Sequence, residues 1–138
     1  MDIKNKVVVI SGGCWGLGKA TAECCLQQGA KVVLLDINED LLTTVAEALN
    51  VPAFVTDVTD SASVEQAASA ISDMCGDIHA VVNCAGVAPA ARMVGRSGPM
   101  PLQDFERVIQ INLVGTFNVM RVLSAKMMQQ QPLNEDGE

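Results

Sequence analysis

The chain has 138 residues, a formal net charge of −7 and no tyrosine, and 49% of its residues are hydrophobic. This length suits one domain, and the composition is typical of an α/β protein whose core is built from alanine, valine and leucine. The acidic balance without basic clusters argues against a nucleic-acid partner, and no apolar run approaches the ~18 residues of a membrane span.

The first predicted elements are a buried strand and a helix joined by a glycine-rich turn. Residues 7–10 are all β-branched, which is typical of a buried strand in a parallel sheet. The glycines of the turn Ser11-Gly12-x-x-x-Gly16-x-Gly18 let a ligand approach the backbone, and the helix start that follows favours an anion such as pyrophosphate. A tight connection without a ligand is the alternative. We predict that the helix faces the core with Leu17, Ala20, Thr21, Cys24 and Cys25.

The second predicted strand, residues 31–36, ends in a carboxylate, Asp36. A carboxylate at this position can accept hydrogen bonds from the adenosine ribose, and it repels a 2′-phosphate. A solvated strand end is the alternative, but the preceding glycine turn favours a cofactor site with NAD preferred over NADP.

Two further helices and two further strands are predicted. Asn38 is a candidate cap for a helix whose core face is Leu41, Leu42, Val45, Ala46 and Leu49. Strand 53–55 leads into Asp57-Val58, at the edge where open α/β sheets bind ligands. Asp60 or Ser61 begins the next helix, which ends at Gly76 and faces the core with Val64, Ala67, Ala68, Ile71 and Met74. Strand 78–82 follows, and we expect its His79 to be structural and partly exposed.

Residues 87–100 form a loop with two arginines, Arg92 and Arg96. Two interpretations stay open: a solvated connection, or a flap that meets an anionic substrate at the mouth of a site. Pro101 then suits the first turn of a long helix, and residues 129–138 form a polar, acidic tail that we expect to fray.

The long helix carries an amide within an otherwise apolar stripe. Asn112 lies on the face that we predict to be buried, and a buried amide must find hydrogen-bond partners in backbone groups, water or a catalytic group. The stripe consists of Phe105, Ile109, Asn112, Thr116, Met120, Leu123 and Met127.

The five cysteines show no metal-ligand spacing, and we interpret them as small buried thiols in a reducing compartment. The first predicted strand starts so early that we expect no signal peptide. These features favour a cytoplasmic protein, with the mitochondrial matrix as the alternative.

Together these motifs resemble the short-chain dehydrogenase/reductase family over the whole chain. The glycine turn, Asp36, Asp57-Val58, Asn83-Cys84-Ala85-Gly86 and 111–116 follow one another in the order typical of the family. Residues 102–108 and 115–119 are most similar to the type-2 3-hydroxyacyl-CoA dehydrogenases.

The resemblance implies a fold, a cofactor and residue roles. The expected fold is a Rossmann-type doubly wound parallel sheet with strand order 3-2-1-4, formed by residues 1–131 and followed by a polar tail, 132–138. Asn112 is implied as the catalytic asparagine, which holds a water in a proton relay. The implied NAD-binding residues are Ser11, Gly12, Gly16, Leu17, Gly18, Asp36, Asp57, Val58, Asn83, Ala85 and Gly86.

The implied activity is oxidation of the 3-hydroxyl of a 3-hydroxyacyl-CoA-like substrate, with hydride transfer from C3 to NAD, in a longer protein that forms a homo-oligomer. The sequence departs from the family at Trp15, where a small or hydroxyl residue is usual, and in lacking the serine and Tyr-x-x-x-Lys that the chemistry needs. We therefore expect the cofactor-binding half of an enzyme, truncated before strand five and inactive by itself. The alternative is a complete, non-catalytic nucleotide-binding or interaction module.

Overall fold

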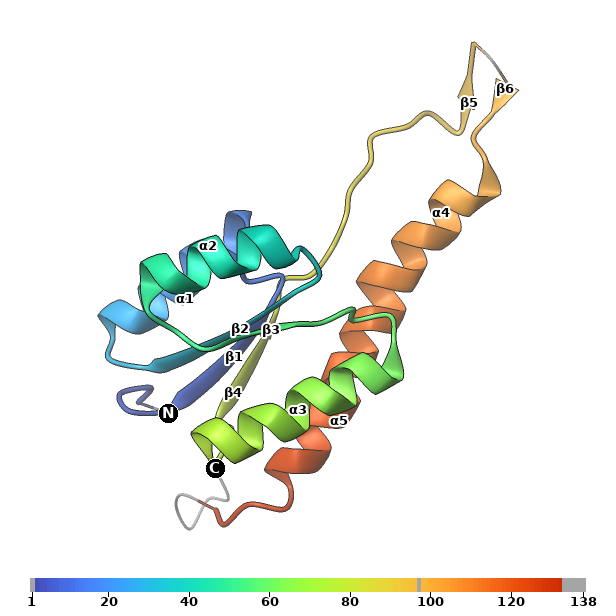
Figure 1. Ribbon diagram of the computed structural model, residues 1–138. Helices are drawn as coiled ribbons and strands as arrows, with labels where there is room; N and C mark the ends of the chain where they lie inside the picture. Colours follow the sequence, from blue (N-terminus) through green and yellow to red (C-terminus); the bar gives the residue numbers. More distant parts are fainter. Residues whose placement is uncertain (1, 97, 133–138) are drawn as a thin grey trace.

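The protein is built around a four-stranded parallel sheet, seen in a computed structural model that describes residues 2–96 and 98–132 (Figure 1). The order β3-β2-β1-β4 confirms the sequence prediction. The strands are β1 (Val7–Ser11), β2 (Lys31–Asp36), β3 (Ala53–Val55) and β4 (Ala80–Asn83).

The core lies on both faces of β1. Successive side chains of a strand point to opposite faces, so Val7 and Val9 join one cluster of buried residues while Val8 and Ile10 join the other. All five residues of β1 are buried, whereas all four residues of β4 are only half-buried. β4 is therefore an edge strand whose side chains are less well covered than those of its neighbour.

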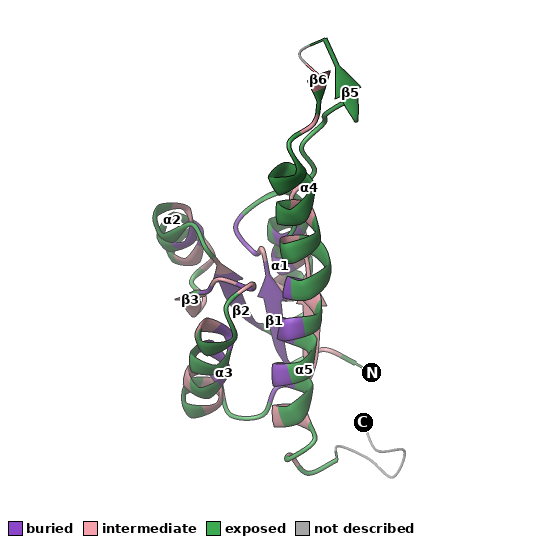
Figure 2. Ribbon diagram, turned by 90° about the vertical axis from the view of Figure 1, so that its right-hand side faces the viewer, coloured by how far each residue is buried: buried purple, intermediate pink, exposed green. Residues whose placement is uncertain are grey.

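Helices cover the two faces of the sheet in pairs. The helices α1 (Gly16–Gln27) and α2 (Glu39–Leu49) contribute to the cluster around Val8. On the other face, α3 (Ser61–Cys75) and α5 (Thr116–Met127) lie side by side over Val7 and Val9 (Figures 1 and 2). Because all four strands are parallel, their carboxyl ends lie on the same edge of the sheet.

The predicted core face of α1 is largely wrong: Cys25 packs against the core, but Leu17, Ala20 and Cys24 are exposed. Leu17 is 82% exposed, and the residues of this helix that are buried are Gly18 and Ala22. A Cβ at Gly18 would collide with the carbonyl oxygen of Gly12, so the helix comes closest to the glycine turn along this stripe of small residues. Close backbone packing, rather than apolar size, decides which face is buried.

The starts of α2 and α3 agree with the sequence. The Asn38 side chain accepts a hydrogen bond from the Leu41 N–H, and Asp60 does the same for Ala62. Met74 is the exception on the predicted core face of α3, because it is 64% exposed near the end of the helix.

The long helix has three parts: α4 (Leu102–Ile109), the π-helical segment η1 (Gln110–Gly115) and α5. The predicted apolar stripe is wrong over much of its length. Phe105 and Met120 are about half exposed, and α4 has no buried residue because it extends beyond the sheet (Figure 2). The wider π turn also shifts the helical register. The buried residues are Gly115, Asn118, Val119, Val122 and Leu123.

Residues 102–127 form a helix that is long and apolar enough to cross a membrane, because an 18-residue stretch of it has a mean hydropathy of 1.3. The sequence nevertheless contains no unbroken apolar run of this length, because Gln110, Asn112 and Asn118 interrupt it. The finding is weak evidence for a membrane, since core helices of water-soluble proteins pass the same test.

The loop at 87–100 contains a small antiparallel hairpin, β5 (Val94–Gly95) and β6 (Gly98–Pro99), which projects away from the sheet (Figure 1). At the other end of the long helix, Gln130 forms two 2.8 Å hydrogen bonds with the backbone of Ile78. The start of the predicted tail is thus fixed to the segment just before β4, and residues 133–138 lie outside the described residues.

Candidate cofactor-binding site

A hollow of about 510 Å³ lies at the carboxyl edge of the sheet. Six of the residues predicted to bind a cofactor line it: Gly12, Asp36, Asp57, Val58, Ala85 and Gly86. Segments far apart in the sequence are therefore brought to one place. A second hollow, of about 530 Å³, lies between α2 and β3 and contains no residue of the glycine turn.

The other predicted residues do not line this hollow: Ser11, Gly16, Leu17, Gly18, Asn83 and Asn112. The Ser11 hydroxyl lies 3.4 Å from Asn83 Oδ1, and the Cys84 N–H donates to the Ser11 carbonyl at 2.9 Å. Ser11 and Asn83 thus join the ends of β1 and β4 behind the hollow.

Sequence reasoning missed a polar part of the lining that comes from the long helix. Arg107, Gln110 and Ile111 have the i, i+3, i+4 spacing of one helical face, and this spacing was the available clue. The predicted apolar stripe of the long helix contains none of these three residues. The remaining lining residues not predicted as cofactor-binding are Trp15, Ile37, Thr56, Thr59, Cys84 and Val87.

The glycine turn is shaped by its own packing as well as by any ligand. Gly12 has φ +65°, and a Cβ there would lie 2.5 Å from the backbone nitrogen of Ala85. Only glycine allows this turn to rest directly on the segment that follows β4. Gly16 also has a positive φ, +49°, but faces open space. Its requirement is therefore conformational.

The N-terminus of α1 differs from those of α2 and α3. Its N-cap residue, Trp15, makes no side-chain capping hydrogen bond. The first N–H groups of a helix have no partners within it, and the helix dipole favours a negative charge there. The Trp15 indole borders the hollow with 79% of its surface exposed, so this residue leaves the helix start accessible.

Asp36 is held at the rim of the hollow by backbone groups on both sides. Its Oδ2 accepts a hydrogen bond from the Cys14 N–H at 3.3 Å, and its Oδ1 accepts one from the Asn38 N–H at 3.1 Å. Burial and the neighbouring Asp36 carboxylate raise the pKa of the Cys14 thiol to about 12. This thiol is thus neutral at physiological pH and adds no charge beside Asp36.

Asp57 is held by its own loop. The Thr59 N–H and hydroxyl both donate to Asp57 Oδ1, at 2.8 and 2.7 Å, while the Asp57 N–H donates to the Ser63 hydroxyl. Within the described part of the chain, Oδ2 of Asp57 makes no hydrogen bond. The carboxylate therefore has a fixed orientation and one oxygen available to a ligand.

Asn112 lies in the π-helical segment and is exposed, so its predicted burial is wrong. The expectation that polar groups must meet its amide is confirmed: Oδ1 accepts from the Val87 N–H and Nδ2 donates to the Val87 carbonyl, both at 2.8 Å. Because the amide is occupied, a water held by Asn112 would use its backbone carbonyl. That oxygen accepts from the Thr116 hydroxyl and has a second lone pair.

His79 has a structural contact, as predicted. Its Nδ1 accepts a hydrogen bond from the Val7 N–H at 3.1 Å, at the end of the sheet away from the hollow. Among the residues that the structure describes, no group of three side chains could hold a metal ion.

These features define a class of protein: an α/β protein of the Rossmann type with a ligand hollow at the carboxyl edge of its sheet. The family model "short chain dehydrogenase" matches residues 6–132. The chain belongs to the short-chain dehydrogenase family.

Similar proteins agree with this assignment. The chain is 42% identical to the 3-hydroxyacyl-CoA dehydrogenase type-2 of Drosophila melanogaster, over 99% of this chain and 54% of that protein. It is 39% identical to the human protein of the same name, over 95% of this chain and 52% of the relative. The chain therefore spans about half the length of the curated relatives it matches.

The chain also superposes on about half of the length of solved structures. The ligand-free aldohexose dehydrogenase of Thermoplasma acidophilum superposes with a TM-score of 0.80 at 27% identity, over 95% of this chain and 48% of that one. The crystal structure of gox2181 gives a TM-score of 0.84 at 27% identity, over 92% of this chain and 50% of that one.

Proposed function

We propose that the hollow at the carboxyl edge of the sheet binds NAD. The observation that carries this proposal is the position of Asp36, fixed at the rim beside the glycine turn. A carboxylate there accepts hydrogen bonds from the ribose hydroxyls and repels the 2′-phosphate of NADP. Membership of the family supports a nicotinamide cofactor, and the charge at the rim supports the choice of NAD.

The residues present fit this cofactor. The accessible N-terminus of α1 suits the pyrophosphate, since no side chain caps it. The free oxygen of Asp57 and the Val58 backbone would hold the adenine, whereas Ala85 and Gly86 would line the nicotinamide side, with Asn83 behind them. When bound, NAD supplies the hydride acceptor, and the protein positions it.

We further propose that the chain is the cofactor-binding half of an enzyme acting on a 3-hydroxyacyl-CoA-like substrate. Its similarity to the type-2 3-hydroxyacyl-CoA dehydrogenases supports this substrate class. In that role the longer protein is a homo-oligomer in the cytoplasm or mitochondrial matrix. A non-catalytic nucleotide-binding module is the second candidate, since the hollow would bind a dinucleotide without the catalytic serine and tyrosine.

Titration calorimetry with NAD and NADP tests the cofactor proposal. We expect NAD to bind with the higher affinity and to change the fluorescence of Trp15, the single tryptophan, which borders the hollow. Equal or tighter binding of NADP by the unmodified chain would contradict the proposed role of Asp36. Binding of neither dinucleotide would overturn the cofactor proposal as a whole.

A further inference from the structure

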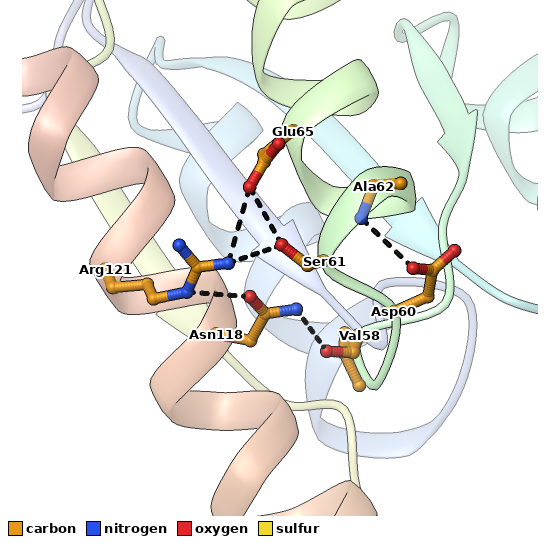
Figure 3. Close-up of polar contacts among 7 residues, drawn as sticks. All are labelled: Val58, Asp60, Ser61, Ala62, Glu65, Asn118 and Arg121. Atoms are coloured by element: carbon orange, nitrogen blue, oxygen red, sulfur yellow. Dashed lines mark hydrogen bonds and ion pairs between the residues drawn. The ribbon is translucent and has the colours of Figure 1, made fainter.

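A polar cluster connects the long helix to the wall of the hollow (Figure 3). At its centre is Asn118 of α5, which is only 6% exposed. Its Nδ2 donates a 2.9 Å hydrogen bond to the backbone carbonyl of Val58. A buried amide is costly unless it is satisfied, so this contact needs a reason beyond apolar packing.

Arg121, one turn further along α5, determines how the Asn118 amide is oriented. Its Nε donates to Asn118 Oδ1 at 3.1 Å. Since a guanidinium can only donate, it requires the oxygen of the amide to face it. The Nδ2 group is then directed at Val58, where a carbonyl accepts it.

The start of α3 holds Arg121 in turn. The Arg121 Nη2 donates to the Ser61 hydroxyl at 2.6 Å and lies 3.4 Å from Glu65 Oε1, while the same hydroxyl donates to Glu65 at 2.8 Å (Figure 3). An unbroken series of hydrogen bonds and one ion pair thus runs from Glu65 through Ser61, Arg121 and Asn118 to the Val58 carbonyl.

Val58 is also confined by its neighbours. It lines the hollow, and on its other side Gly115 comes so close that a Cβ there would lie 2.6 Å from Val58 Cγ2. Asp57, with its free carboxylate oxygen, immediately precedes it. A shift of the Val58 carbonyl would therefore move both residues proposed to face the adenine.

We propose that Asn118, oriented by Arg121, is a positioning residue that fixes the wall of the hollow contacting the adenosine half of the dinucleotide. This inference rests on the proposed binding of NAD. The inference goes beyond NAD binding because it assigns a role to Asn118 and Arg121, two residues of the long helix that line no part of the hollow.

The test compares Asn118→Asp with a matched control, Gln130→Glu. Each change replaces an amide donor that bonds a backbone carbonyl, at 2.9 Å to Val58 and at 2.8 Å to Ile78, but Ile78 lies at the opposite end of β4 from the hollow. Binding of 5′-AMP and of nicotinamide mononucleotide is followed by NMR titration, and NAD binding by calorimetry.

We expect Asn118→Asp to weaken binding of AMP and NAD about fivefold, the usual effect of one hydrogen bond, and to change nicotinamide mononucleotide binding by less than about twofold. Gln130→Glu should leave all three affinities unchanged even where it lowers stability. A merely structural role for Asn118 would not separate AMP from nicotinamide mononucleotide, so equal losses for both, or none, overturn the inference.

Two further measurements, on Arg121→Met and on the unmodified chain, cover the case in which Asn118→Asp does not fold. If Asn118→Asp does not fold, Arg121→Met replaces it, with an expected loss of about twofold for AMP alone, and unchanged AMP binding overturns the inference. If the unmodified chain binds neither NAD nor AMP, the proposed function itself has failed. Normal binding by the unmodified chain and by Arg121→Met would leave the cofactor proposal intact and refute only the role of the long helix.

Discussion

The charge at Asp36 is expected to determine which dinucleotide binds, and Asp36→Asn isolates this charge. Asparagine has the same shape and keeps one oxygen that accepts a hydrogen bond from Cys14 or Asn38, while the hydrogen bond to the other N–H is lost. The negative charge at the rim is lost, and with it the repulsion of a 2′-phosphate.

The size of the effect follows from Coulomb's law. A carboxylate and a phosphate group with two negative charges, ~5 Å apart in water, repel each other by about 1.7 kcal/mol, and a half-buried rim raises this somewhat. About 2 kcal/mol corresponds to a gain of roughly 30-fold in NADP affinity. NAD should lose about fivefold, because a hydrogen bond to a charged acceptor becomes one to a neutral acceptor.

Calorimetry with both dinucleotides measures these changes, and Asp40→Asn is the control. Asp40 lies in the first turn of α2 and loses the same charge without contributing to the hollow. The control should leave the ratio of NAD to NADP affinities unchanged. If Asp36→Asn leaves that ratio within about twofold of the original, or if Asp40→Asn shifts it equally, the local charge is not the cause of selectivity.

Three further predictions concern activity, association and pH. These 138 residues should show no turnover of acetoacetyl-CoA with NADH, because they contain no tyrosine and general acid–base catalysis supplies ~10²–10⁴-fold; clear turnover by the mass-verified chain would be the contrary result. Association through the half-buried edge strand β4 should give light-scattering masses above the monomer, whereas a monomer with strongly protected amides at residues 80–82 would show a covered edge. Burial lowers the pKa of His79, so the unfolded chain binds the proton more readily, and the free energy of unfolding should fall as the pH drops through ~6.5. His79→Gln should reduce this loss of stability in urea titrations at several pH values. An unchanged pH dependence in the variant would argue against a contribution from His79.

The positions of the strands and helices could be predicted because their determinants are local, whereas the order of the strands was implied by the family resemblance. The β-branched run of β1, the second strand ending at Asp36 and the caps Asn38 and Asp60 each depend on neighbouring residues. Parallel strands that alternate with helices then have few allowed arrangements. The same logic placed Asp36 and Asp57 on one edge, because carboxyl ends of parallel strands meet there.

The faces of the helices could not be read from periodicity in the same way. In α1 the buried stripe is set by the approach of Gly18 to Gly12, so Leu17 is exposed although it is the more apolar residue. In the long helix, the π-helical segment changes the register, and α4 extends beyond the sheet that would bury Phe105.

The polar contacts of the long helix were decided by tertiary structure alone. The Asn112 side chain forms hydrogen bonds with the backbone of Val87, and the Asn118 side chain donates one to the carbonyl of Val58, 60 residues away in the sequence. An amide and a backbone carbonyl leave no pattern in the sequence that shows they will pair, because every residue except proline offers the same backbone donor and acceptor. Only the packing of α5 against α3 and the end of β4 selects which carbonyl lies within reach.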